Sequence, residues 1–322
     1  MYLFKFEPIL KQTIWGGNKI ITYKNLDSDL QQVGESWELS DVPGHESIVA
    51  NGPLKGLSFP ELISRFGASL VGRENLIRFG NRFPLLVKFI DARKDLSIQV
   101  HPDDSLAHSR HNCSGKNEMW YVISAEPGAR LCSGLSRHIT PDEYEERVAS
   151  NTIEEVLQFH DIHPGDVFNI PSGCVHSIGA GVFLAEIQQT SDITYRIYDF
   201  NRRDADGNLR QLHTELAKDA INYNLTENSK SIYTPVLNQP VELLSTPYFT
   251  TSLYKLTEPL MCDYSELDSF VIMICTEGSA QLSDDKDNRI SIAQGETVLI
   301  PAETESLYIY PEDKVTLLES WV

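Results

Sequence analysis

The chain is poor in cysteine, in positive charge and in long apolar runs. Its five cysteines form an odd set without C-x-x-C spacing, so we expect reduced thiols rather than a disulfide framework. Lys and Arg number 27 against 46 Asp and Glu, a net charge of −19, which disfavours nucleic acid and anionic membranes as partners. No apolar run approaches the ~18–20 residues that span a bilayer, and the N-terminus lacks the pattern of a signal peptide. We therefore expect a cytoplasmic protein.

Most apolar residues gather in short runs that are typical of strands. The runs are rich in β-branched and aromatic residues and are bounded by Gly, Pro, Asn or Asp: 83–90, 119–123, 182–188, 269–275 and 297–301. Many short strands with turn residues between them favour a sandwich or a barrel. Small helices are expected to start near Ser58, Thr140 and Thr214, with a weaker candidate at 103–111.

An internal repeat predicts two related β-barrels. The segment Gly165-Asp-Val-Phe-Asn-Ile-Pro171 is echoed by Gly295-Glu-Thr-Val-Leu-Ile-Pro301, but His176 after the first copy corresponds to Ser306 after the second. We expect a metal-bearing catalytic domain at 1–231, a polar linker at 225–231, and a C-terminal domain at 232–322 without a metal site. The second domain, which contains no histidine, is expected to cover the edge of the first.

Four polar residues are candidates for a metal site. Gln99 and His101 are two apart, so on a strand both side chains leave the same face. Glu118 opens a predicted strand, and His176 follows a Pro-Gly turn. Two imidazoles, a carboxylate and an amide oxygen suit a divalent ion such as Zn²⁺, with Mn, Fe, Co or Ni left open. The alternative is that these are ordinary buried or hydrogen-bonded side chains.

Several blocks resemble one family, the type I mannose-6-phosphate isomerases (phosphomannose isomerases), in their short bacterial form. They occur in order along nearly the whole chain: Ile14-Trp-Gly-Gly17, Gly34-Glu-Ser-Trp-Glu-Leu-Ser40, Gln99-Val-His101-Pro, Gly115-Lys-Asn-Glu118-Met-Trp-Tyr, Ile170-Pro-Ser-Gly-Cys-Val-His176-Ser and Glu186-Ile-Gln-Gln-Thr-Ser-Asp-Ile-Thr-Tyr-Arg196. The resemblance implies a mainly β fold of two cupin-type (jelly-roll) barrels with small helical insertions. It also implies one Zn²⁺ per chain held by Gln99, His101, Glu118 and His176, and interconversion of mannose 6-phosphate and fructose 6-phosphate. Arg196 and Lys116 match active-site positions of the family.

Aldose–ketose isomerisation moves a proton between C1 and C2, so it needs a base and electrophilic help where oxygen charge develops. Glu186 is the leading candidate for the base, with Lys116 and a metal-bound hydroxide as alternatives. Glu186 could instead orient a ligand histidine. Phosphate binding is expected from Arg196, Lys116 and Lys88. Because an uncompensated ammonium is costly in an apolar strand, Lys88 either lies in the pocket or pairs with a buried carboxylate.

Two other functions fit part of the pattern. An Fe²⁺-dependent cupin oxygenase would also accept a His/Glu/His set, but Gln99 and the three cations argue against it. A non-catalytic sugar-binding or sensing cupin would not need Lys116, Glu186 and Arg196 together. The expected partner is a small sugar phosphate, and we expect a monomer, although a dimer is possible.

Overall fold

The computed structural model describes residues 1–203, 206–224 and 229–322. The predicted linker at 225–231 therefore falls partly outside the described residues. Its last residues lie against the strand at Val167–Ile170: the Ser229 carbonyl accepts the Asn169 N–H at 2.8 Å, and the Ser231 N–H donates to the Val167 carbonyl at 2.9 Å. The division at 231/232 stays a prediction.

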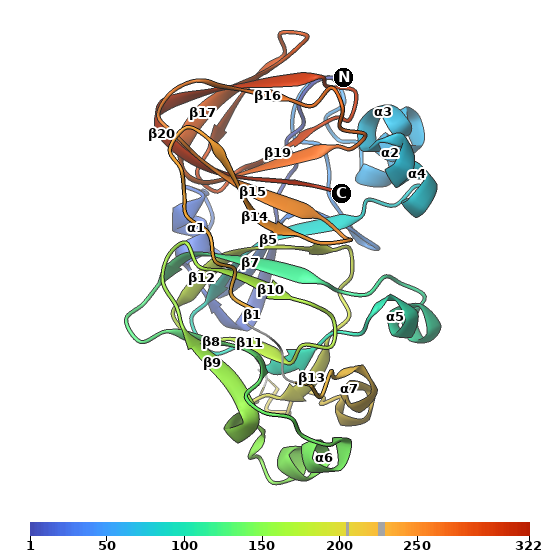
Figure 1. Ribbon diagram of the computed structural model, residues 1–322, viewed down its shortest axis with the longest axis vertical. Coiled ribbons are helices and arrows are strands. Elements are labelled where there is room, and N and C mark those ends of the chain that lie inside the picture. The colour runs from blue at the N-terminus through green and yellow to red at the C-terminus, as the bar shows by residue number, and fades with distance from the viewer. Residues whose placement is uncertain (204–205, 225–228) are drawn as a thin grey trace.

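The first β-sandwich consists of two antiparallel sheets (Figure 1, lower half). One sheet has six strands in the order β1 (Ile9–Gly17), β2 (Val33–Leu39), β5 (Leu85–Ala92), β12 (Val182–Gln189), β7 (Glu118–Ala125) and β10 (Val167–Ile170). The other has five, in the order β13 (Tyr195–Tyr198), β6 (Ile98–Val100), β11 (His176–Ile178), β8 (Arg130–Leu135) and β9 (Leu157–Asp161). A small separate hairpin joins β3 (Asp41–Val42) to β4 (His45–Glu46).

The second β-sandwich is one seven-stranded sheet that wraps around its own apolar core (Figure 1, orange to red). Two long strands, β17 (Val271–Asp284) and β20 (Ser306–Trp321), take part in both of its faces. The other strands are β14 (Pro240–Ser245), β15 (Thr250–Leu256), β16 (Leu260–Asp263), β18 (Arg289–Ala293) and β19 (Thr297–Ile300). The mainly β fold class predicted from the sequence is confirmed.

Strand periodicity separates the site from the structural core. Along β5, all eight residues are buried, but alternate side chains leave opposite faces. Val87 and Phe89 enter a core between the two sandwiches, whereas Lys88 and Ile90 line a cavity in the first sandwich. A strand buried on both faces therefore supplies core residues and site residues in turn.

The core between the sandwiches is continuous. It joins residues of β5, β7 and β12 to residues of β15, β17 and β20, including Phe89, Tyr121, Ile272, Ile274 and Leu318. The second sandwich thus packs across the outer face of the six-stranded sheet, and the expectation that it covers the edge of the first domain is wrong. The N-terminal residues also cross over, because Phe4 pairs with Leu299 of β19.

Two helices begin where capping residues predict them, whereas the predicted cap Thr214 is instead the first residue of its helix and His213 occupies the N-cap position. α2 (Phe59–Phe66) follows Ser58, and α6 (Pro141–Ala149) follows Thr140, whose Oγ1 accepts the Glu143 N–H at 3.1 Å. The others are α1 (Lys19–Tyr23), α3 (Ala68–Val71), α4 (Arg73–Phe79), α5 (Asp104–His111), α7 (Thr214–Ala220) and a 3₁₀ turn at Ile153–Val156. In the described part of the chain, every helix is too short or too polar to cross a bilayer.

Candidate metal centre and active site

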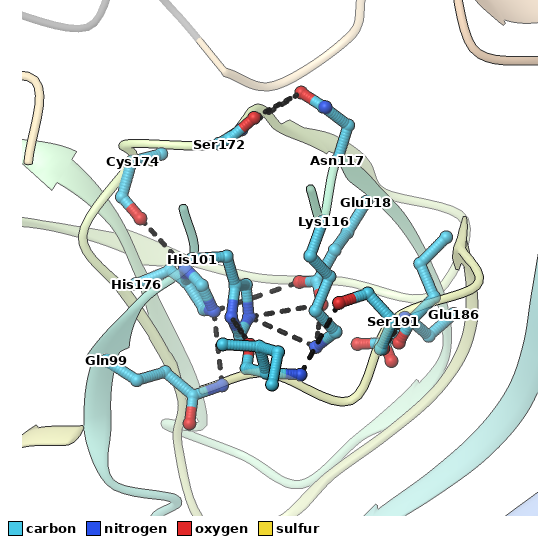
Figure 2. A network of polar contacts seen from close by, with 12 residues as sticks. Gln99, His101, Lys116, Asn117, Glu118, Ser172, Cys174, His176, Glu186 and Ser191 are labelled. Atoms are coloured by element: carbon cyan, nitrogen blue, oxygen red, sulfur yellow. Dashed lines mark hydrogen bonds and ion pairs between the residues drawn. The ribbon is translucent and has the colours of Figure 1, made fainter. Parts of the chain in front are cut away.

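Three strands of the first sandwich bring the predicted metal ligands together. Gln99 on β6 stands opposite His176 on β11, His101 directly follows β6, and Glu118 begins β7. The ligand atoms of His101, Glu118 and His176 lie within 4.8 Å of one another, and all three side chains are buried. Figure 2 shows the two imidazoles side by side, facing the carboxylate. Residues that are distant in the sequence thus converge inside the sandwich.

Backbone carbonyl groups fix the orientation of each imidazole ring. His101 Nδ1 lies 2.8 Å from the Ile193 carbonyl, and His176 Nδ1 lies 2.9 Å from the Cys174 carbonyl. Since a carbonyl only accepts, each Nδ1 carries the proton and each Nε2 presents its lone pair. The Nε2 atoms lie 3.3 Å and 3.8 Å from Glu118. Metal-binding histidines are commonly oriented in this way through their other ring nitrogen, and here backbone carbonyls accept that hydrogen bond, not Glu186.

Charge in this cluster is set by Lys116. Its Nζ lies 2.5 Å from Glu118 Oε1 and 3.1 Å from His101 Nε2. Burial alone would raise the pKa of Glu118, but the ammonium and the two imidazoles hold that pKa well below its usual range. Burial, and then the charge of Lys116, lower the pKa of His101 to about 3. The carboxylate is therefore ionised and the imidazole neutral, which are the states a divalent ion requires.

The donor set fits a divalent metal. Apart from the ion pair with Lys116, neither buried oxygen of Glu118 accepts a hydrogen bond from a described residue. Gln99 presents its amide to His176 Nε2 at 3.2 Å, and a rotation of that amide exchanges its nitrogen for the oxygen that a metal would bind. Imidazole, carboxylate and amide oxygen together are ligands for Zn²⁺ and similar ions.

A cavity of about 540 Å³ opens beside this cluster, a size suited to a small ligand. Gln99, Lys116 and His176 form one side of it, and Lys88 and Glu186 form another. In a chain of net charge −19, this cavity gathers four cations, Lys88, Lys116, Arg196 and Arg210, beside three acids, Glu35, Glu186 and Asp192.

Lys88 and Glu186 form a buried ion pair at the cavity wall. They stand opposite each other on β5 and β12, with Nζ 3.2 Å from Oε1. Glu35 adds a second carboxylate 3.6 Å from Lys88 Nζ, and the Trp120 Nε1–H donates to Glu186 at 2.9 Å. Burial would lower the pKa of Lys88, but the carboxylates of Glu35 and Glu186 raise it. Burial and then Glu118 raise the pKa of Glu186. Both alternatives for Lys88 therefore hold, since it lies in the pocket and neutralises buried acids.

Arg196 on β13 also lines the cavity and stands opposite Gln99 of the neighbouring strand β6. Its Nη1–H donates to the Gln211 carbonyl at 2.9 Å, while its buried Nε has no partner among the described residues. Arg210 also lines the cavity and is held by Asp199. One end of the Arg196 guanidinium is thus held by a hydrogen bond, and its Nε–H can donate another.

Sequence reasoning missed three charged residues of this cavity, Glu35, Asp192 and Arg210. Two arginines of the loop after β13, Arg202 and Arg203, are not among the lining residues: Arg202 pairs with Asp199, and Arg203 donates to the Gly207 carbonyl. Glu35 lies inside the motif 34–40 and could have been noticed as an acid in an apolar strand. Nothing local to Arg210 distinguishes it from its neighbours.

Comparison with known proteins agrees with this geometry. A model of the phosphomannose isomerase type I catalytic domain matches residues 3–121, and one of the mannose-6-phosphate isomerase cupin domain matches residues 241–316. Mannose-6-phosphate isomerase ManA of Bacillus subtilis is 34% identical over 311 residues, which cover 96% of this chain and 90% of the relative. The chain belongs to the type I phosphomannose isomerases. That membership confirms the family and the enzyme class predicted from the motifs, and it supports neither the oxygenase nor the sensor.

Other relatives of this phosphomannose isomerase support the same assignment. The mannose-6-phosphate isomerase of Streptococcus mutans is 35% identical over 261 residues, 78% of this chain and 79% of the relative. The crystal structure of the mannose 6-phosphate isomerase from Bacillus subtilis matches with a TM-score of 0.87 at 28% identity, covering 100% of both chains. The cupin-type fold expected from the sequence is therefore confirmed.

Proposed function

We propose that this chain interconverts mannose 6-phosphate and fructose 6-phosphate by moving a proton between C1 and C2. One observation carries the proposal. A buried His/Glu/His set with its lone pairs turned toward one point adjoins a cavity that holds Lys88, Lys116 and Arg196. A sugar phosphate needs both electrophilic help at its reacting oxygens and cations for its phosphate.

We propose one Zn²⁺ per chain, held by Gln99, His101, Glu118 and His176. When bound, the ion would polarise the sugar oxygens on which negative charge develops. Lys116, whose ammonium lies against Glu118, keeps that carboxylate ionised and offers N–H donors to the same oxygens. We therefore propose that Lys116 acts at the reacting end of the sugar.

Glu186 is the base that the geometry favours. Its carboxylate lines the cavity, and its pKa is raised by burial, which strengthens it as a proton acceptor. The Trp120 N–H and the Lys88 ammonium fix its two oxygens. Lys88 would therefore support proton transfer by keeping Glu186 in place and partly ionised.

Arg196 is the phosphate ligand that we favour most strongly. Lys88 and Lys116 each neutralise a buried carboxylate. They therefore make the electrostatic potential of the cavity more positive, but each is already paired with an acid. The planar guanidinium of Arg196 suits bidentate contact with phosphate oxygens.

A coupled assay tests the reaction and the metal together. Protein stripped with a chelator is given Zn²⁺ and mannose 6-phosphate, and fructose 6-phosphate is measured beside bound metal. We expect Zn²⁺ to restore activity at one ion per chain, and His101→Ala to lose both. His163→Ala is the control, since that histidine is exposed and should change neither.

Failure has two distinct forms. Turnover that survives complete removal of metal would refute metal dependence while keeping the isomerase. No turnover of mannose 6-phosphate with any divalent ion would refute the substrate. The cytoplasmic location and the monomeric state also stay predictions, which fractionation and light scattering would check.

A further inference from the structure

Strand register places a buried acid of the second β-sandwich where the first has Glu186. In each sandwich, a row of residues that stand opposite one another runs across four neighbouring strands. The row starts three positions after the glycine of the repeat, which is Gly165 in the first sandwich and Gly295 in the second. In the first, the row is Phe168, Trp120, Glu186 and Lys88. In the second, it is Val298, Met273, Glu319 and Ser252. Glu319 on β20 is therefore the counterpart of Glu186, with a serine opposite it instead of a lysine.

A second cavity opens at this point. It has a volume of about 340 Å³ and is lined by Glu319 and by Asp263 of β16. Asp263 stands opposite Ser306, just as Gln99 stands opposite His176, so it is the counterpart of a proposed metal ligand. The second sandwich has thus kept a hollow in the place of the catalytic one.

This cavity lacks the basic residues that line the first cavity. All of its lining residues are described, and they include two acids but no Lys, Arg or His. The histidine counterpart at 306 is serine and the Glu118 counterpart is Val271, so the metal ligands are gone. A phosphate would meet only negative charge here.

Glu319 is buried without a cation. Its side chain is 3% exposed, and no Lys or Arg among the described residues lies within ion-pair distance. The hydroxyls of Tyr254, at 2.8 Å, and Tyr264 donate to its two oxygens. A carboxylate has about four lone-pair sites, so two stay free for a donor that enters from the cavity.

The walls suit the rest of a cationic ligand. Tyr254, Tyr264 and Trp321 supply aromatic surface, and Leu260 and Met261 supply apolar surface, with Met261 51% exposed at the mouth. A cation gains from aromatic faces and from a desolvated carboxylate. The net charge of −19 raises the local concentration of cations further.

We propose that the second β-sandwich binds a small primary organic ammonium, with the ammonium on Glu319 and its short apolar chain against Leu260 and Met261. The site is separate from the isomerase cavity and does not depend on the function proposed for that cavity. Its ligand would be a cation, whereas a sugar phosphate is an anion.

Calorimetric titration of the whole protein with n-butylammonium chloride tests the proposal. For so small a ligand we expect a dissociation constant on the order of 1 mM. Butyrate and 1-butanol, of similar size but without the positive charge, should not bind detectably. Glu319→Gln should weaken binding at least about tenfold, the effect of losing one charge-assisted contact, and should leave isomerase activity unchanged.

Two further variants make the result decisive. Glu186→Gln, the matched change in the first sandwich, should bind n-butylammonium like the unmodified protein, which excludes binding in the isomerase cavity. Met261→Lys places a cation at the exposed mouth without disturbing the core, and should weaken binding even if Glu319→Gln does not fold. Absence of binding up to about 100 mM, equal binding of butyrate, or unchanged affinity in Met261→Lys and Glu319→Gln would overturn the proposal.

Discussion

Replacing Lys88 with methionine tests whether the buried ion pair at the cavity wall is needed by the fold. Methionine keeps the length and apolar character of the side chain but removes the charge that lies 3.2 Å from Glu186 and 3.6 Å from Glu35. Lys88 and Glu186 are 5% and 4% exposed, so water can compensate for the lost partner only from the side of the cavity. Breaking such a pair costs about 3–5 kcal/mol.

The lower end of that range applies here. Glu186 keeps the hydrogen bond from Trp120, and burial already raises its pKa, so in Lys88→Met it can take up a proton instead of remaining charged. The native state then binds more protons than the unfolded chain, and stability falls as the pH rises above the usual range of a glutamate. We expect a loss of about 3 kcal/mol near pH 8, or roughly 4–5 °C in melting temperature for a chain of this length, and a smaller loss near pH 5.

A double-mutant cycle measures the pair directly. Lys88→Met, Glu186→Gln and the double variant are melted side by side, and the double variant should melt above Lys88→Met because less charge is left buried without a partner. Lys314→Met is the control: its ion pair with Glu277 is exposed, so little change is expected. A Lys88→Met midpoint within about 1 °C of the unmodified protein, or strictly additive effects, would refute the reasoning.

Three further predictions concern single side chains. Arg196→Lys should raise the KM for mannose 6-phosphate about tenfold or more, since a bidentate charged contact is lost; steady-state kinetics with unchanged KM would contradict a phosphate role. Thr140→Ala removes the cap of α6 and should cost about 1 kcal/mol, measured as a lower melting temperature, with Thr257→Ala as a control outside any helix. Burial raises the pKa of Glu319, so its native state holds the proton more tightly than the unfolded chain and loses stability as the pH rises. The melting temperature of Glu319→Gln relative to the unmodified protein should therefore increase from pH 5 to pH 8, and a constant difference would contradict this.

Much of the fold could be predicted because local signals and tertiary structure agree. All residues of β5 and β12 are buried, so each strand has two buried faces. In the sequence, both strands are visible as short apolar runs that Lys88 and Glu186 interrupt. A charged residue in such a run is costly unless it is paired, so its presence alone points to a site. The two-residue spacing of Gln99 and His101 likewise follows from strand geometry.

The remaining features depend on which strands become neighbours. Glu35 reaches Lys88 only because β2 pairs with β5, and Arg210 reaches the cavity through a loop held by Asp199. The packing of the second sandwich across a face has the same origin, because β17 turns Ile272 and Ile274 toward the first sandwich and Met273 away from it. The alternation of side chains along a strand shows that both of its faces are apolar. It does not show which element packs against each face.

The internal repeat shows how a shared fold can carry two chemistries. The glycine and proline that define the repeat shape a turn between strands, so they persist where the site residues do not. In the first sandwich, Lys88 opposes the buried acid and makes ionisation tolerable. In the second, Ser252 takes that place, and tyrosine hydroxyls satisfy Glu319 without supplying charge. The loss of the lysine, together with Ser306 and Val271 at the positions of His176 and Glu118, leaves a cavity without cations or metal ligands, while the strands around it stay in register.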